Sequence, residues 1–117
     1  MNFEKSALFQ IASMRMQWLS DRQKVVSENI ANADTSEYRA KDVESFTQYL
    51  DRADGTSEDM SALVFEDETS WGASISGNNV VLEEQILKAS NAASEYRMAS
   101  SLYRKAHEML LTVSSGR

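Results

Sequence analysis

Apolar residues recur at helical spacing in two long stretches, one at each end of the 117-residue chain. Intervals of three, four and seven residues place such side chains on one face of an α-helix. In the first stretch the apolar positions are Leu8, Ile11, Ala12, Trp18, Leu19, Val25, Val26 and Ile30. In the second they are Leu82, Ile86, Ala89, Ala93, Tyr96, Ala99, Tyr103, Ala106, Leu110 and Val113. Proline is absent and every glycine except Gly116 falls within residues 55–77, so we predict two uninterrupted amphipathic helices.

The second stretch also repeats itself after seven residues. Ser94, Tyr96, Arg97 and Ala99 recur as Ser101, Tyr103, Arg104 and Ala106. A seven-residue period keeps one seam of a helix against a neighbouring helix, and alanine on that seam lets the helix axes approach closely. The predicted fold is therefore mainly α, with N- and C-terminal amphipathic helices forming a coiled-coil-like hairpin. We assign residues 1–33 to the N-terminal helix, 34–79 to an irregular middle segment and 80–117 to the C-terminal helix.

The middle segment is acidic. Residues 51–68 contain seven acidic side chains and a single basic one, whereas the rest of the chain holds 11 of each. Like charges repel one another, which favours a solvated segment. Residues 42–50 could extend a helix or form a strand. Residues 63–65 could pair with a segment around Trp71 and Ile75, giving a short β-hairpin with its turn at residues 66–70.

Composition excludes several classes of function. The chain has no cysteine and a single histidine, His107, so it lacks the residues for a cysteine or histidine-rich metal site and for most Ser-His catalysis. A net charge of −6 without a basic cluster disfavours nucleic acid as a partner. No apolar run is long enough to span a membrane, and the N-terminus lacks the pattern of a cleaved secretory signal. We expect no enzymatic activity, no cofactor and no bound metal.

The apolar stripes bury too little surface to stabilise an isolated pair of helices. Ordering about 60 helical residues costs more backbone entropy than the burial of about ten large apolar side chains offsets. We therefore expect the missing burial to come from other subunits of an assembly. The residues predicted to pack between subunits are Leu8, Ile11, Trp18, Leu19, Val25, Val26, Ile30, Leu82, Ile86, Tyr96, Tyr103 and Leu110.

Two arginines interrupt the stripe of the first helix. Arg15 and Arg22 occupy positions on the apolar face, where a charge is costly unless it is paired. We predict that they meet carboxylates or helix C-termini on neighbouring subunits. The alternative is that both side chains reach the edge of the seam, where the guanidinium groups stay in water.

The end of the first helix carries a recognisable pattern. Residues 27–35 read SENIANADT and are followed by Tyr38, Ala40, Asp42 and Phe46. This pattern resembles the N-terminal signature of the flagellar rod, hook and hook-associated axial proteins. The motif residues are Asn29, Ile30, Ala31, Asn32, Asp34, Thr35 and Tyr38. Within this group, a short chain whose second helix opens with residues 77–80 (GNNV) and Leu82-Glu83 is most similar to the proximal rod proteins of the bacterial flagellar basal body.

The resemblance implies a structural subunit of the proximal rod, whose terminal helices assemble into a hollow rod that transmits torque and passes export substrates. The implied partners are other rod subunits, further copies of the chain, and basal-body components at the inner-membrane ring and export gate. The implied location is the periplasmic rod, reached by type III export without a cleaved signal peptide. The alternatives are another short rod protein of the same superfamily, or a cytoplasmic helical adaptor or export chaperone. A small enzyme is the least favoured of these possibilities.

Two positions depart from the family pattern. The usual Pro-Gly before the tyrosine is replaced by Ser36-Glu37, so the local sequence does not favour a tight turn there. Val81 stands where the family has an acidic residue that could cap the second helix. Asn78 and Asn79 are the remaining candidates for the N-cap, and we predict that Asn79 caps the helix. Glu83 and Glu84 lie in the first turn, where negative charges interact favourably with the helix dipole.

Overall fold

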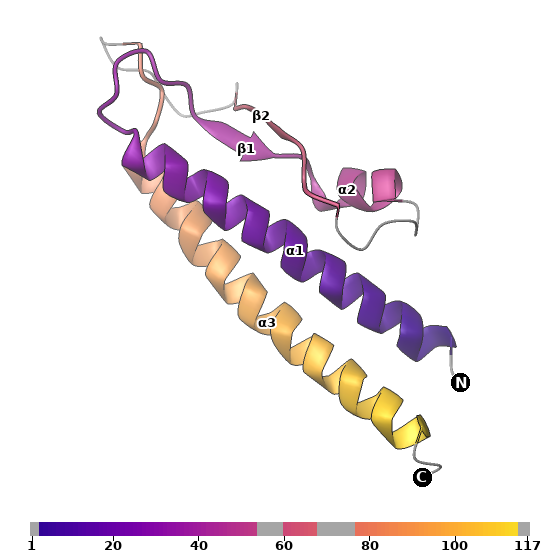
Figure 1. The fold of residues 1–117 in the computed structure, drawn as a ribbon. Coiled ribbons are helices and arrows are strands. Elements are labelled where there is room, and N and C mark those ends of the chain that lie inside the picture. The colour runs from indigo at the N-terminus through magenta and orange to yellow at the C-terminus, as the bar shows by residue number, and fades with distance from the viewer. Residues whose placement is uncertain (1–2, 54–59, 68–76, 115–117) are drawn as a thin grey trace.

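The computed structural model describes residues 3–53, 60–67 and 77–114 of the chain. Its elements, in chain order, are α1 (Phe3–Ala31), β1 (Lys41–Val43), α2 (Phe46–Ala53), β2 (Val64–Glu66) and α3 (Leu82–Ser114). α1 and α3 run side by side in opposite directions, so both termini lie at the same end of the molecule (Figure 1). We call this the free end and the opposite end, where the middle segment joins the helices, the turn end. The helical hairpin and the small sheet confirm the predicted fold class.

The molecule is elongated. Its extents are 64 × 25 × 17 Å and its radius of gyration is 17.6 Å. A compact chain of the same length would have a radius of gyration of about 13 Å. An elongated shape leaves more side chains at the surface than a compact one does, which bears on how this chain packs with others.

The seam between the long helices follows the predicted seven-residue period. Ala92, Ala99 and Ala106 of α3 are buried at that interval. They face α1, in which Ala12, Leu19 and Val26 are buried at the same interval. The alanines allow the two helices to lie close together, because each projects only a methyl group into the seam. Ala99 and Ala106 are on the seam as the sequence predicts. The predicted Ala89 and Ala93 are only half-buried, and Ala92, seven residues before Ala99, is buried in their place.

The two strands form an antiparallel pair at the turn-end half of the hairpin. Lys41 lies opposite Glu66, and Val43 lies opposite Val64. Residues 42–50 thus contain both of the structures considered for them, the end of β1 and the start of α2. The described partner of β2 is β1. The predicted partner segment around Trp71 and Ile75 lies outside the described residues.

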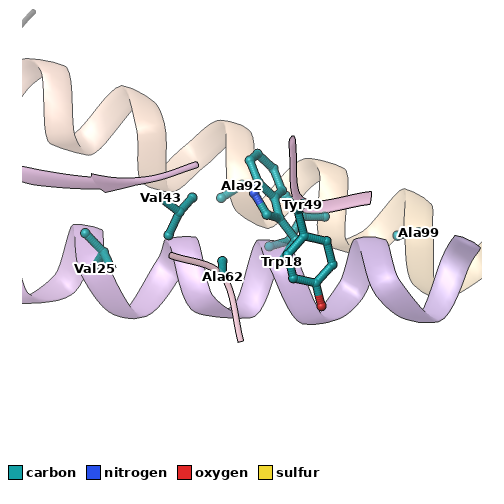
Figure 2. Packing of buried hydrophobic residues seen from close by; sticks show 8 residues of the cluster. Trp18, Val25, Val43, Tyr49, Ala62, Ala92 and Ala99 are labelled. Carbon is teal, nitrogen blue, oxygen red and sulfur yellow. The ribbon is translucent and has the colours of Figure 1, made fainter. Parts of the chain in front are cut away.

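The middle segment packs its apolar side chains against the hairpin. Trp18 of α1 packs edge-on against Phe46 of α2, with ring centroids 5.7 Å apart, and Phe46 stacks on Tyr49 at 6.1 Å. Figure 2 shows side chains of α1, β1, α2 and α3 gathered in one cluster, which includes Val43 of β1 and Ala92 of α3. These residues of β1 and α2 precede the acidic stretch 51–68. Within the described part of that stretch most side chains are exposed, as expected for a solvated segment, and the buried ones are Ala53 and Ala62.

The predicted N-cap of the C-terminal helix is wrong. α3 begins at Leu82, and the carbonyl of Val81 accepts the first helical hydrogen bond from Gln85 N at 3.1 Å. The Asn79 side chain instead accepts a hydrogen bond from the backbone N–H of Ala40. Asn78 donates from Nδ2 to the carbonyls of residues 32 and 35, at 2.8 and 2.6 Å. Both amides therefore join the start of α3 to the segment that follows α1, because that segment has backbone groups to satisfy.

Candidate assembly surface

Asn29 fastens the turn end of the hairpin. Its side chain is fully buried and lies where α1, β1 and α3 meet. Nδ2 donates to the carbonyl of Lys41 at 2.8 Å and to Oε1 of Gln85 at 2.9 Å. Oδ1 accepts from the N–H of Lys41 at 3.0 Å and from the hydroxyl of Tyr38 at 3.1 Å. Both donors and both acceptor positions of the amide are thus used, which an aspartate or a leucine could not reproduce.

Asn32 and Thr35 shape the chain after α1. Asn32 Nδ2 donates to the carbonyl of Glu28 at 2.8 Å, and Thr35 Oγ1 donates to Asn32 Oδ1 at 3.0 Å. These bonds close the end of the helix locally, as asparagine and threonine side chains commonly do. Of the other motif residues, Ile30, Ala31 and Asp34 have exposed side chains.

A tight turn follows, although its sequence does not favour one. Tyr38 N donates to the carbonyl of Thr35 at 3.2 Å, so residues 35–38 form a β-turn. Glu37, the third residue of this turn, has a φ of 62°. A positive φ at the third position is typical of a type II turn and is normally supplied by glycine. Gly77, with a φ of 81°, lies against Glu37: a Cβ placed on Gly77 would be 3.5 Å from the Cα of Glu37.

A charged cluster ties β1 and the end of β2 to the helices. Lys88 Nζ lies 3.1 Å from Asp42, 2.9 Å from Asp67 and 3.3 Å from Glu84. Asp42 also forms an ion pair with Arg22 of α1 at 3.4 Å. Burial alone would lower the pKa of Lys88, but its hydrogen bonds and charge interactions with Asp67 and Asp42 outweigh that effect and raise the pKa. The cluster bridges the furrow between α1 and α3 and holds β1 over it.

The stripe arginines pair with carboxylates, as predicted, but within the chain. Arg15 of α1 forms an ion pair with Glu95 of α3 at 3.0 Å. The guanidinium carbons of Arg15 and Arg22 also lie 4.7 and 5.6 Å from the centroid of the Trp18 ring. The prediction that neighbouring subunits supply the carboxylates is therefore wrong for the described contacts, because α3 and β1 already provide them.

Glu44 anchors α2 and the chain before β2. Its side chain is almost completely buried and forms an ion pair with Arg52, and it accepts a hydrogen bond from Leu63 N at 2.7 Å. The backbone carbonyl of Glu44 accepts a hydrogen bond from Trp18 Nε1 at 2.7 Å. The hydrogen bond from Arg52 lowers the pKa of Glu44, although burial acts in the opposite direction. These bonds connect the short middle elements to α1.

At the free-end half of the hairpin the furrow between α1 and α3 is open. It forms a groove of about 650 Å³ that starts beside Phe46, the first residue of α2. Most of its lining is apolar, and the ion pair between Arg15 and Glu95 borders it. We call this feature the open groove and define it by Ile11, Arg15, Phe46, Met98, Leu102 and Lys105.

Small residues form the base of the open groove and large apolar residues its sides. Ala12 and Ala99 line the groove although both are buried in the seam, so they form its floor. Ile11, Leu102 and Met98 are 45%, 39% and 70% exposed. A concave apolar surface of this kind is typical of a site that another apolar segment covers.

Two comparisons with known proteins bear on this chain. A family model described as flagella basal body rod protein matches residues 9–39. The chain is also 32% identical, over 120 aligned residues, to the flagellar basal body rod protein FlgB of Agrobacterium fabrum. The alignment covers 89% of this chain and 90% of that relative. This chain belongs to the flagellar basal body rod protein family.

The family defines the kind of function: this rod protein is a structural subunit of the flagellar basal body rod. The matched residues 9–39 cover most of α1 and the turn around Glu37, so they include the buried Asn29. The conformation of that turn is the one that Pro-Gly would favour, even though Ser36-Glu37 replaces this pair. Glu37 thus adopts the positive φ that a glycine normally supplies at this position of the turn.

The residues predicted to pack between subunits divide into three groups in the rod protein. The buried group consists of Trp18, Leu19, Val25 and Val26. The half-buried group consists of Leu8, Tyr96, Tyr103 and Leu110. The exposed group consists of Ile11, Ile30, Leu82 and Ile86. The first group packs inside the subunit, whereas the exposed group is accessible to neighbouring molecules.

Several residues that organise the rod protein are not among those predicted from the sequence. Glu44 and Lys88 make contacts that hold the middle segment on the hairpin, and Gln85 of α3 accepts a hydrogen bond from Asn29 of α1. One available signal was the four-residue spacing of Glu84 and Lys88, which form an ion pair in α3. No local signal identifies Glu44, because its partners Arg52 and Leu63 meet it only through the tertiary fold.

The described residues of the rod protein contain no cluster of three or more potential metal ligands. His107 is exposed on α3, with its ring centroid 6.1 Å from that of Phe9. No helix in the described part of the chain has the length and apolar character needed to cross a bilayer.

Proposed function

We propose that this rod protein is a subunit of the proximal rod, as its likeness to FlgB suggests. Its terminal helices would assemble into a hollow rod that transmits torque and passes export substrates. The observation that best supports this proposal is the elongated hairpin, whose furrow the middle segment covers at one half only. Such a subunit has apolar side chains left for contacts with its neighbours, including Ile11 and Met98 in the open groove.

The proposal extends to partners and location. The partners are other rod subunits, further copies of the same chain, and basal-body components at the inner-membrane ring and export gate. The location is the periplasmic rod, which the chain reaches by flagellar export without a cleaved signal peptide. A slender helical hairpin suits this route, because little tertiary packing must be undone for an extended chain to pass through a channel. Residues 1–33 and 80–117 form the assembly part of the chain.

Gene deletion in the source bacterium tests the proposal. Cells that lack the protein should be non-motile and should lack a complete rod in electron micrographs of purified basal bodies. The full chain should restore both, and a tagged copy should co-purify with basal bodies. Variants that lack residues 1–10 or 108–117 should fail, because each deletion removes part of a terminal helix.

A matched control distinguishes assembly from expression. Thr47→Ala changes an exposed side chain on α2 and should complement the deletion fully. Complete rods and normal motility in the deletion strain would contradict the proposal. So would a protein that stays in the cytoplasm bound to an export substrate, which an adaptor or chaperone would do.

A further inference from the structure

The two outer edges of the small sheet differ in what covers them. At the outer edge of β1, which faces away from β2, the side chain of Asn29 bonds both backbone groups of Lys41. Nδ2 donates to the carbonyl at 2.8 Å, and Oδ1 accepts from the N–H at 3.0 Å. A side chain that takes the place of a neighbouring strand closes the edge to further pairing. The chain thus closes this edge by itself.

The outer edge of β2 has backbone groups without such partners. In an antiparallel pair, successive residues direct their N–H and C=O groups alternately toward the partner strand and away from it. A bond of 2.8 Å from Asp67 N to the carbonyl of Ala40 shows that Asp67 and, by alternation, Phe65 face β1. The backbone groups of Val64 and Glu66 therefore point away from β1, and no hydrogen bond joins them to another described residue.

Apolar side chains beside this edge are exposed. Leu63, Val64 and Phe65 are 47%, 48% and 50% exposed. Strands at the edge of natural sheets commonly carry lysine or proline, which prevents a further strand from pairing with them. β2 has neither residue, and its one charged side chain, Glu66, disfavours a partner of like charge rather than every partner.

The charge around β2 determines which strand can pair with it. Residues 51–68 contain seven acidic side chains and a single basic one, Arg52, which already forms an ion pair with Glu44. Opposite charges on neighbouring strands attract each other, whereas like charges repel. Pairing with β2 of a second copy would bring together two segments with the same excess of acidic residues. A strand that carries lysine or arginine is therefore favoured over a second copy of β2.

We propose that the outer edge of β2 binds an extended, basic segment of a partner protein, which joins the sheet as a third strand. The backbone of Val64 and of Glu66 each provides one donor and one acceptor for it. A lysine or arginine of the partner lies opposite Glu66, and an apolar residue lies opposite Phe65 on the other face of the sheet. This inference goes beyond the proposed function and does not depend on it.

Two synthetic peptides of equal length test the proposal on the full chain. One alternates lysine with valine and the other alternates glutamate with valine, so both favour a strand and they differ in charge. At millimolar concentration the basic peptide should shift the amide NMR resonances of Val64 and Glu66. It should also slow the hydrogen exchange of these two amides several-fold, because they become hydrogen-bonded. The acidic peptide should change neither quantity.

Two controls separate strand pairing from the attraction of charges alone. In a third peptide proline replaces valine, so the lysines remain but the backbone cannot pair as a strand, and this peptide should not slow the exchange. Val64→Pro removes an N–H that points away from β1 and leaves the bonds between β1 and β2 in place. In this variant the basic peptide should no longer protect Glu66. Val64→Thr keeps the N–H and should bind the peptide like the wild type.

Three results would overturn the inference. The first is slow exchange of the Val64 and Glu66 amides in the chain alone, which would mean that another part of the same chain covers the edge. The second is equal binding of the basic and acidic peptides. The third is a dimer in sedimentation experiments that Val64→Pro abolishes, which would assign the edge to a second copy. None of these results bears on the proposed rod function, which the gene deletion tests separately.

Discussion

The two halves of the helical hairpin share one alanine-rich seam but differ in what covers it. At the turn-end half, β1, α2 and β2 lie along the hairpin, as Figure 1 shows, and the charges of Asp42 and Lys88 bridge the furrow. At the free-end half the open groove leaves Met98 and Leu102 exposed. The furrow of the first half is covered by the chain's own residues, whereas the furrow of the second half leaves apolar side chains exposed.

The two halves of the hairpin differ in their polar contacts, whereas the alanine-rich seam runs through both. Asn29 makes four hydrogen bonds at the turn end, which define the register of α1, β1 and α3. The ion pair between Arg15 and Glu95 lies at the boundary between the two halves. Beyond it, within the described part of the groove lining, apolar contacts predominate and permit a neighbour to join. A subunit can thus be ordered at one half and still associate through the other.

The largest expected effect separates two leucines, one from each half. Leu19→Ala should lower the free energy of unfolding of the isolated chain by about 3 kcal/mol, because Leu19 is fully buried in the seam. Leu102→Ala should cost less than about 1 kcal/mol, since Leu102 is 39% exposed in the open groove. Urea unfolding followed by circular dichroism measures both. Equal losses for the two variants would show that the halves do not differ in burial as described.

The next effect concerns the amide that fastens the turn end. Asn29→Ala should destabilise the chain by about 2–4 kcal/mol, because the buried amide of Gln85 and the partly buried groups of Lys41 and Tyr38 lose their partner. Asn91→Ala, at an exposed position of α3, is the matched control and should change stability little. Thermal unfolding curves of both variants supply the measurement. If the Asn29 variant were as stable as the control, the Asn29 amide would not be what stabilises the turn end.

A smaller effect is expected from the backbone of the turn. Glu37→Gly should stabilise the chain by about 0.5–1 kcal/mol, because glycine adopts the positive φ of this position without steric cost. Gly77→Ala should act in the opposite direction by about 1 kcal/mol, since its φ of 81° is unfavourable for alanine. The midpoints of denaturant unfolding of the two variants measure both changes in stability. Changes of the same sign in both variants would be inconsistent with the two left-handed conformations.

The smallest effect is a dependence of stability on pH. The pKa of Glu44 is lowered in the folded chain by the hydrogen bond from Arg52, so the unfolded state binds more protons as the pH falls below the ordinary carboxyl range. The contribution of Glu44 is complete above its unfolded pKa of about 4.3 and is lost as the pH falls through its lower folded pKa.

Glu44→Gln should therefore flatten the fall in stability between about pH 5 and 3. Unfolding midpoints at several pH values give the slope. Glu66→Gln removes an exposed carboxylate of β2 and is the control, which should keep the slope of the wild type. An unchanged slope in the Glu44 variant would mean that its ion pair with Arg52 does not contribute to stability.

The long helices could be predicted from the sequence because the signals for them are local and repeated. The spacing of apolar residues, the seven-residue repeat and the absence of proline all favour the same structure. The buried Ala92, Ala99 and Ala106 follow the period that the repeat gives. The signature around Asn29 pointed to the family in the same way, since it lies in one continuous segment.

The errors concern residues whose partners lie far along the chain. Asparagine is a common N-cap residue, but Oδ1 of Asn79 accepts a hydrogen bond from the backbone N–H of Ala40, 39 residues earlier. The sequence predicts that Arg22 meets a carboxylate or a helix C-terminus of a neighbouring subunit, yet Asp42 forms an ion pair with it within the chain. Local propensity cannot reveal such choices, because several partners are compatible with the same short pattern.

By itself the sequence determined two amphipathic helices, their alanine-rich seam and membership of a family of axial proteins, because each is encoded by regular spacing or by a continuous motif. Only the tertiary structure decided that β1 and α2 fill one half of the furrow and leave the other half open. That division depends on buried contacts made by Asn29, Glu44 and Lys88 across 8 to 56 residues of chain. Which distant partner each polar side chain pairs with is decided only when the whole chain is folded.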